Sequence, residues 1–197
     1  MLPVRKATLA DVDRLSEAIA RAFDDDPIWQ RIFPKRRHHE RARAFTAYEL
    51  QRHYLGEDET WTTADGIKGA AVWMPPNKWK QPTRDTLRAM PTTLRHIGMN
   101  SISAYRALGA LEAAHPPGEH YYLSILGTDP TYQGQGVASA CLEPVLTRCD
   151  EQGVGAYLES SKEQNIPFYK RHGFEVTREL PLPGGWPSVW LMWRDPR

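Results

Sequence analysis

The sequence predicts an α/β fold built on a mixed sheet. Short runs rich in β-branched and aromatic residues alternate with longer stretches in which apolar residues recur at helical spacing. Read along the chain, the order is β-α-α-β-β-α-β-α-β-α-β-β, and such alternation is typical of helices packed on a sheet. The chain has 197 residues, 41% of them hydrophobic and 25% charged. This length and balance predict one folded domain, residues 1–197.

The first third predicts a strand followed by two helices. Val4 opens the strand, and Thr8 with Asp11 forms a capping-box pattern at the start of the first helix. Four apolar residues then follow on one helix face: Val12, Leu15, Ile19 and Phe23. Pro27 ends this helix, because a residue before proline avoids the helical region. The periodicity predicts a second helix over about 34–55.

The middle of the chain predicts a hairpin and then a helical segment. Residues 61–63 and 67–73 have strand character, and the Asp65-Gly66 pair between them favours a tight turn. The helical segment covers about 79–115. We expect Pro91 and Gly98 to interrupt it.

The last third carries the clearest pattern. We expect the following elements, in order: a strand at 121–126, a helix at 134–151, a strand at 154–159, a short helix at 165–172, and strands at 174–178 and 189–193. Gly173 is a typical C-terminal glycine of the short helix.

The charge balance excludes a surface built to coat nucleic acid or anionic membrane. There are 25 Lys and Arg against 24 Asp and Glu, so the formal net charge is +1. No run of 18 apolar residues is present, so we expect no bilayer-spanning segment. The N-terminus has no apolar core before its first charges, which argues against a secretory signal and leads us to expect a cytoplasmic protein.

The two cysteines predict neither a disulfide nor a metal site. Cys141 and Cys149 are eight residues apart, or about 12 Å on one helix, which is too far to bridge. No His or acidic ligands accompany them at metal spacing, so we expect no bound metal.

A glycine-rich turn stands between the predicted strand at 121–126 and the helix after it. Gly134 and Gly136 would let backbone amides approach an anion, and the helix start adds free N–H groups and a positive dipole end. A P-loop is excluded, because Gly136 is not followed by Lys and Ser or Thr. A dinucleotide fingerprint fits poorly, because six residues separate Gly127 from Gly134 and only 38 residues follow Glu159.

Two motifs in this region resemble the GNAT superfamily of acyl-CoA N-acyltransferases. Gln133-x-x-Gly136-x-Ala138 is similar to its Gln/Arg-x-x-Gly-x-Gly/Ala signature. The block from Asn165 to Phe174, with Tyr169 and Gly173-Phe174, is similar to its second conserved block. The two occur in the family's order, and together they are a strong indication.

The resemblance implies a GNAT-type mixed, mostly antiparallel sheet of six to seven strands flanked by helices. The fourth and fifth strands, here 121–126 and 154–159, would splay apart and admit acetyl-CoA as the co-substrate. The residues implied to bind it are Leu126, Gly127, Thr128, Gln133, Gly134, Gln135, Gly136, Val137, Ala138, Asn165, Phe168 and Tyr169.

The resemblance also implies the chemistry. Tyr169 would protonate the departing thiolate, as the matching tyrosine does in many members. The acceptor amine must lose a proton before it attacks, and Glu159 at the end of its strand is the first candidate for the base. Three residues on the neighbouring strand stay open as alternatives: Glu119, His120 and Tyr121. We expect Phe23, Asp26, Tyr121 and Trp186 to border the acceptor.

These expectations converge on an N-acetyltransferase that acts on a primary amine of a small molecule by direct attack in a ternary complex. A protein lysine or N-terminal acetyltransferase, and a non-catalytic acyl-CoA-binding sensor, remain the alternatives. Members of the superfamily are often dimers, so a homodimer is one assembly that the resemblance allows.

Overall fold

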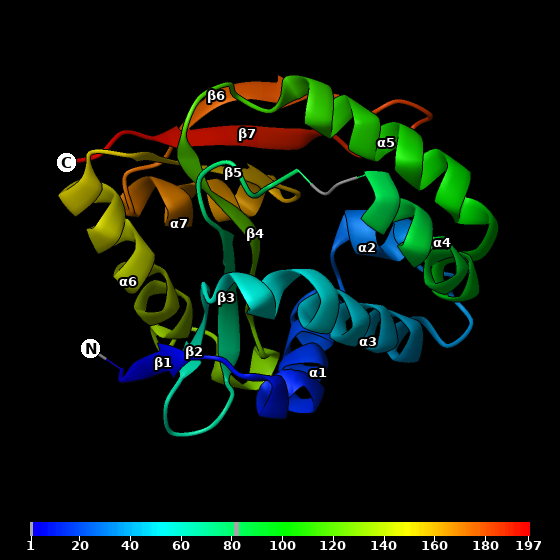
Figure 1. Ribbon diagram of the computed structural model, residues 1–197, viewed down its shortest axis with the longest axis horizontal. Coiled ribbons are helices and arrows are strands. Elements are labelled where there is room, and N and C mark those ends of the chain that lie inside the picture. The colour runs from blue at the N-terminus through cyan, green and yellow to red at the C-terminus, as the bar shows by residue number, and fades with distance from the viewer. Residues whose placement is uncertain (1, 81–82) are drawn as a thin grey trace.

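The computed structural model describes residues 2–80 and 83–197, and its core is one seven-stranded sheet (Figure 1). The strand order is β1-β2-β3-β4-β5-β7-β6. The strands are β1 (Val4–Lys6), β2 (Thr60–Thr63), β3 (Gly69–Met74), β4 (His120–Thr128), β5 (Gly155–Ser160), β6 (Glu175–Leu180) and β7 (Val189–Arg194). Only β4 and β5 pair in parallel among these neighbours; the other pairs are antiparallel. The predicted fold class is confirmed.

Helices cover both faces of the sheet. They are α1 (Val12–Ala22), α2 (Pro27–Ile32), α3 (His38–Glu49), α4 (Thr83–Ile97), α5 (Ser101–Ala114), α6 (Val137–Gln152) and α7 (Ile166–Arg171). In Figure 1, α6 and α7 lie together on one side, and α1 to α5 lie on the other. On β3, Ala71 and Trp73 pack toward α6, whereas Ala70 and Val72 pack toward α1. The sheet is therefore buried on both faces, as the unbroken apolar run in β3 predicts.

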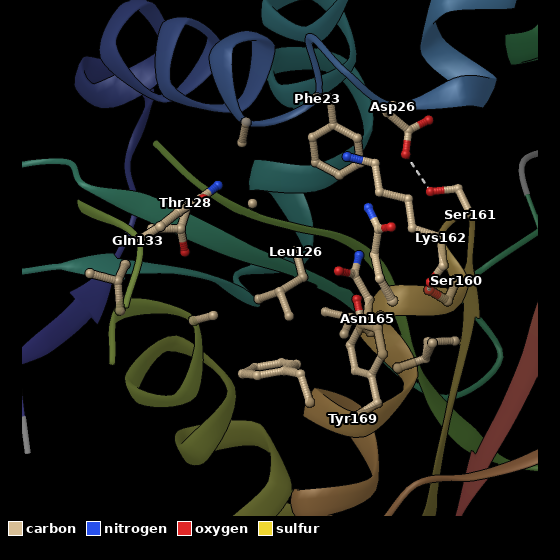
Figure 2. A pocket seen from close by; sticks show the side chains of 18 of the residues that line it. Phe23, Asp26, Leu126, Thr128, Gln133, Ser160, Ser161, Lys162, Asn165 and Tyr169 are labelled. Atoms are coloured by element: carbon tan, nitrogen blue, oxygen red, sulfur yellow. Dashed lines mark hydrogen bonds between the residues drawn. The ribbon is translucent and has the colours of Figure 1, made fainter. Parts of the chain in front are cut away.

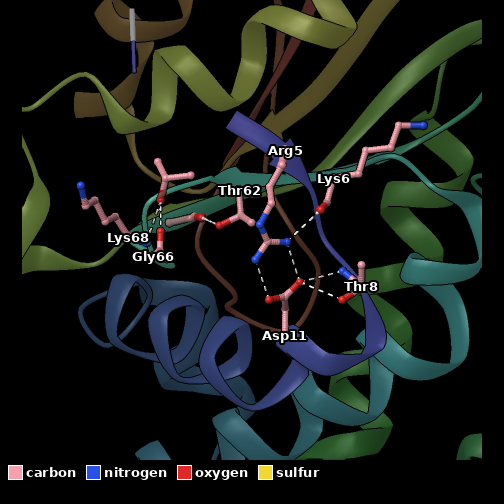
Figure 3. Close-up of polar contacts among 9 residues, drawn as sticks. Arg5, Lys6, Thr8, Asp11, Thr62, Gly66 and Lys68 are labelled. Carbon is pink, nitrogen blue, oxygen red and sulfur yellow. Dashed lines mark hydrogen bonds and ion pairs between the residues drawn. The ribbon is translucent and has the colours of Figure 1, made fainter. Parts of the chain in front are cut away.

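The capping-box pattern near the N-terminus forms as predicted (Figure 3). The backbone N–H of Thr8 donates to Asp11 Oδ2 at 2.9 Å, and a single 3₁₀ turn, Leu9–Asp11, leads into α1. Arg5 donates to both oxygens of Asp11, at 2.8 Å each. These bonds lower the pKa of the Asp11 carboxyl well below its usual range, with the Arg5 contact as the largest cause. They fasten β1 to the first helix.

The structure differs from the predicted elements at several places. The helix expected from residue 134 begins at Val137, because Gly134 and Gly136 adopt positive φ values of 75° and 80°. α2 was not predicted; Asp26 caps it by accepting from the N–H groups of Ile28 and Trp29. α4 continues through Pro91, so the expected break there is wrong, whereas the break at Gly98 is confirmed by a 3₁₀ turn, Gly98–Asn100.

α4 and α5 form a hairpin that lies over the sheet on the α1 side (Figure 1). α5 packs through Ala107 against a cluster that contains Tyr157, Trp186 and Leu191. α4 meets the other helices through Ile97, which packs with Phe33 and Ala42. The hairpin therefore roofs part of the sheet that α1 leaves uncovered.

The register of β4 changes at Ser124. Val72 of β3 pairs with Ile125, and the next residue, Trp73, pairs with Leu123, so Ser124 is an extra residue in β4. The parallel pairing with β5 ends at the same place, at Leu123 and Leu158. Past this point β4 stays paired with β3 as far as Thr128, and β5 stays paired with β7 as far as Ser160. β4 and β5 thus separate from each other, while β4 stays paired with β3 and β5 stays paired with β7.

Among the described residues, no helix is both long enough and apolar enough to cross a bilayer.

Candidate active site

The opening between β4 and β5 is the floor of a cavity of about 610 Å³ (Figure 2). Leu126 and Thr128 line it from β4, and Glu159 and Ser160 line it from β5. Phe23, after α1, borders it on the opposite side. Because β4 and β5 do not pair here, the backbone groups on their facing edges are free to bind an extended ligand.

We call this 610 Å³ cavity the cofactor cleft. The glycine-rich turn lies at one end of it. Gly134 and Gly136 line it, and both have left-handed backbone conformations. A Cβ at either position would meet nothing within 4 Å, so these glycines serve the turn geometry and leave its cleft side open. Val137 and Ala138 follow in the first turn of α6, where N–H groups have no partner within the helix. The site therefore presents amides and a positive dipole end to an anion.

Two basic side chains that no sequence motif singles out, Lys162 and Arg171, border the cofactor cleft. Lys162 follows β5 and makes an ion pair with Asp25, and Arg171 ends α7 with its guanidinium over the Phe168 ring. Lone basic residues are common on surfaces, so nothing in their local sequence separates them from solvated ones. Their positions add positive charge to a cleft that already has a helix start.

Asn165 and Tyr169 lie on the α7 side of the cofactor cleft (Figure 2). Phe168, also in α7, lines the cleft as well. Burial raises the pKa of the Tyr169 phenol, and the nearby Asp26 charge raises it further. The phenol is therefore fully protonated at neutral pH, which is the form a general acid needs. Ser139 and His172 join α6 to the end of α7 through a 3.0 Å hydrogen bond and so fix this wall.

Asp26 lines the cofactor cleft but acts first as a structural group. Its carboxylate caps α2 and accepts a hydrogen bond from the Ser161 hydroxyl (Figure 2). Burial raises its pKa, against the lowering effect of the Ser161 and backbone N–H donors. Asp26 thereby ties the loop after α1 to the end of β5, across the mouth of the cleft.

A second cavity of about 590 Å³ lies under the α4–α5 hairpin and meets the cofactor cleft at Ser124 and Glu159, which line both. We call it the acceptor cavity. Its described lining is mostly apolar and aromatic, with Trp79, Tyr105 and Trp186 among the large side chains. The carboxylates in this lining are Glu49, Glu112 and Glu159, and none of the described lining residues is Lys or Arg.

Glu159 lies at the junction of the two cavities with its side chain only 9% exposed. His115 Nδ1 is 3.8 Å from Glu159 Oε1. Burial, followed by the charge of Glu159, raises the pKa of Tyr122 and of Tyr157. The carboxylate therefore faces neutral phenols and an imidazole.

Tyr54 reaches the same junction from a π-helical turn, Leu50–Tyr54, after α3. Its hydroxyl is 2.8 Å from the hydroxyl of Ser124, the extra residue of β4. Burial raises the pKa of Tyr54 to about 12, so the phenol stays neutral. Neither residue was selected from the sequence, because neither the π-helical turn nor the bulge has a sequence signature in a single chain.

The structure brings most of the predicted site residues together. Phe23 and Asp26 line the cofactor cleft and Trp186 lines the acceptor cavity. Tyr121 lines neither: its side chain packs in the core beside α6, and its hydroxyl donates to Gln152 at 3.1 Å. Strand alternation explains this, since Tyr121 points to the face opposite Tyr122, which does line the acceptor cavity. Gln135, in the turn, is exposed and does not line the cofactor cleft.

Comparison with known proteins identifies the class that this fold and cleft define. Residues 26–174, more than half of the chain, match the acetyltransferase (GNAT) family. The chain belongs to this family.

Individual relatives match over shorter stretches. An uncharacterized N-acetyltransferase of Schizosaccharomyces pombe is 39% identical over 62 residues, which cover 32% of this chain and 25% of that protein. A mycothiol acetyltransferase of Propionibacterium freudenreichii is 38% identical over 68 residues, which cover 33% of this chain and 21% of that protein. The matched stretch is thus a quarter or less of these two curated relatives.

Solved structures extend the likeness to the whole fold. A Corynebacterium glutamicum "histone acetyltransferase HPA2 and related acetyltransferase" superposes with a TM-score of 0.76 at 23% identity, over 100% of this chain and 98% of that one. An agmatine N-acetyltransferase superposes with a TM-score of 0.66 at 14% identity, over 99% and 100%. At these identities the likeness concerns the fold alone.

Members of the GNAT fold family bind acetyl-CoA, and the cofactor cleft fits it. The unpaired strand edges suit the amides of the pantetheine arm. The left-handed glycines, the start of α6 and the cations Lys162 and Arg171 suit the phosphates. Within residues 2–80 and 83–197, no cluster of three or more metal-ligating side chains occurs.

Proposed function

We propose that the protein transfers the acetyl group of acetyl-CoA to a primary amine of a small molecule, by direct attack in a ternary complex. The observation that carries this proposal is the acceptor cavity, which has its own volume of about 590 Å³ and shares Ser124 and Glu159 with the cofactor cleft. Two substrates bound in the two cavities would meet at those residues.

The chemistry of the acceptor cavity favours a small cationic molecule with an apolar body. Three carboxylates attract an ammonium group, and the apolar and aromatic walls favour burial of the rest. Residues of both α4 and α5 line the cavity, so the hairpin forms one of its walls. A lysine or an N-terminus on a folded protein would need an open groove, so this added helical wall favours a free small molecule.

Glu159 would accept a proton from the ammonium, and the neutral amine would then attack the thioester carbon. The C–N bond forms as the C–S bond breaks, and Tyr169 would give its proton to the leaving thiolate. The nitrogen's remaining excess proton restores the phenol. This scheme needs no acyl-enzyme, and the buried Cys141 and Cys149 line neither cavity.

Within the family, we further propose a resemblance to puromycin N-acetyltransferase. The similar stretches include residues 70–73, 115–117, 158–159 and 165–174. Residues 77–112 match weakly, and they include the α4–α5 hairpin that roofs the acceptor cavity. This similarity therefore supports the proposed type of reaction. The identity of the acceptor depends on the residues that line the acceptor cavity.

A thiol-release screen with acetyl-CoA tests the proposal. The amines should span nucleoside antibiotics, aminoglycosides, polyamines and peptides, with Tyr169→Phe run beside the native protein. We expect release with small amines that carry one cation on an apolar body, and intersecting double-reciprocal lines when both substrates are varied.

The other outcomes separate the alternatives. Release with peptides or folded proteins and with none of the small amines would indicate a protein acetyltransferase. Acetyl-CoA binding without release across the whole panel would indicate a sensor. Parallel lines would indicate a covalent intermediate and contradict direct attack.

A further inference from the structure

A chain of buried polar contacts runs from the backbone to Glu159 through two histidines. His120 Nδ1 lies 3.0 Å from the carbonyl oxygen of Gly118, and His120 Nε2 lies 2.8 Å from His115 Nε2. His115 Nδ1 then faces Glu159 Oε1 at 3.8 Å. The side chain of His115 is 3% exposed and His120 is 1% exposed, so bulk water does not replace these contacts.

This chain fixes which nitrogen carries each proton. A carbonyl oxygen only accepts, so His120 Nδ1 must donate to Gly118. Burial and the neighbouring His115 lower the pKa of His120, which keeps it neutral and leaves its Nε2 as an acceptor. His115 Nε2 must therefore be the donor of the 2.8 Å contact. The Nδ1 of neutral His115 is then an unprotonated base that faces the carboxylate.

We propose that His115 is the second proton acceptor of the active site, positioned by His120 and acting through Glu159. This inference rests on the proposed function, because the proton is the one that the acceptor amine releases. The ammonium N–H bond breaks to give its proton to the Glu159 carboxylate, which passes it to His115 Nδ1. His115 becomes an imidazolium and Glu159 is again an anion; after the products leave, the imidazolium returns its proton through Glu159 to the water that enters the emptied cavity.

The surroundings of His115 suit a ring that gains a positive charge. Trp79 stacks on it with ring centroids 3.7 Å apart, and a tryptophan face stabilises a cation. Tyr122 and Tyr157 hold it edge-on, at 5.0 and 4.7 Å. The gap of 3.8 Å to Glu159 is longer than a hydrogen bond, and such catalytic contacts commonly tighten when substrate binds.

The titratable groups around His115 come from several elements. β4 supplies His120 and Tyr122, β5 supplies Tyr157 and Glu159, and the same cavity is lined by Glu49 of α3, Tyr54 of the π-helical turn and Glu112 of α5. Among these groups, only the carboxylates can carry a negative charge at neutral pH, and the buried phenols of Tyr54, Tyr122 and Tyr157 stay neutral.

Two measurements test the proposal on the full chain. The first is a long-range proton–nitrogen NMR spectrum of protein labelled at its histidine nitrogens, assigned with His115→Phe and His120→Phe. We expect neutral His115 to carry its proton on Nε2 and to gain the second on Nδ1 as pH falls, while His120 keeps a single proton on Nδ1. A neutral His115 with its proton on Nδ1, or titration of His120 first, would overturn the proposal.

The second measurement is the pH dependence of kcat/KM for His115→Phe, which keeps an aromatic ring against Trp79 but accepts no proton. We expect a loss of roughly 10- to 100-fold at pH 7 that closes toward pH 9.5, where the free amine no longer needs a base. A loss that is equal at every pH, or no loss, would refute the proton role. His115→Gln, which can still donate to His120, gives the same test if the phenylalanine variant does not fold.

His39→Phe is the matched control, because the His39 ring forms a hydrogen bond with Glu17 and lines neither cavity. Its pH profile should match that of the native protein. If native protein releases no thiol with any amine, the proposed function fails, whereas the NMR titration still decides where the proton of His115 lies.

Discussion

Leu123 and Leu158 form the last pair at which β4 and β5 face each other in register. One residue later, Ser124 is the extra residue of β4, and Glu159 points to the place where the two cavities join. The separation of β4 and β5 therefore begins at Glu159, the candidate base. Both strands keep their outer partners, so the opening is held by the sheet itself.

Tyr169→Phe should lower kcat by roughly 10²- to 10⁴-fold, because the thiolate would leave without a proton donor. Acetyl-CoA affinity should stay within a few-fold of native, since the phenyl ring still packs against Phe168 and Phe174. Steady-state kinetics and calorimetric titration with CoA measure the two effects. Tyr48→Phe is the control, as Tyr48 lines neither cavity; a parallel loss of kcat and CoA affinity in Tyr169→Phe would mean that Tyr169 is structural.

Gly136→Ala should weaken acetyl-CoA binding several-fold and destabilise the fold by roughly 1–2 kcal/mol, because Gly136 has a φ of 80° in the phosphate-facing turn. Gly153→Ala provides a matched control at the other end of α6. Its φ is 66°, and a Cβ there also meets nothing within 4 Å. Thermal unfolding should show similar losses in both variants, and only Gly136→Ala should raise the KM for acetyl-CoA. Equal effects on KM would contradict a role for this turn in binding.

Neither cysteine should react with a thiol reagent in the native protein. Burial raises the pKa of Cys141 and of Cys149 to about 12, so roughly one thiol in ten thousand is ionised at pH 8. Titration with a chromogenic disulfide should count no thiols in the native protein and two after unfolding in urea. Rapid labelling of the native protein, or an acetyl group on either cysteine after incubation with acetyl-CoA, would support an acyl-enzyme intermediate and contradict direct attack.

Asp11→Asn should destabilise the fold by about 1 kcal/mol at pH 7, because it removes the paired bonds from Arg5. Asp11 has a lowered pKa in the folded state, so the unfolded chain binds its proton first as pH falls. The stabilisation is complete above the unfolded pKa near 4 and is lost as pH falls through the lower folded value. Urea unfolding should therefore show the difference between native and variant narrowing below about pH 4.

Asp13→Asn is the control for this effect. Asp13 is 90% exposed and its contact with Arg43 is 3.8 Å long, so the substitution should be nearly neutral at every pH. A difference between native protein and Asp11→Asn that stays constant from pH 7 to pH 3 would show that the carboxylate charge is not the cause.

Local patterns predicted the elements that hold the cofactor cleft. The aromatic and β-branched run of β4, the glycine turn and the Asn165-to-Phe174 block each depend on residues close in sequence, so one chain is sufficient to find them. Side-chain placement on a strand was less certain: Tyr121 and Tyr122 are adjacent, and only the second lines a cavity.

The acceptor cavity could not be predicted, because its walls come from segments far apart in the chain. Glu49, His115 and Trp186 line one cavity although they come from three distant segments of the chain. The bulge at Ser124 depends on the partner strand β3, and the continuity of α4 through Pro91 shows tertiary packing overriding a local preference. His120 was considered from the sequence as a base, and the structure instead connects it to Glu159 through His115.

The α4–α5 hairpin, which lines the acceptor cavity, is a single segment of the chain between β3 and β4. The cofactor cleft instead depends on the gap between β4 and β5, which is part of the sheet. Under the proposed function, exchange of the stretch 83–114 would change which amine is accepted and leave the binding of acetyl-CoA unaltered. A chimera that carries this hairpin from a relative should inherit that relative's acceptor preference.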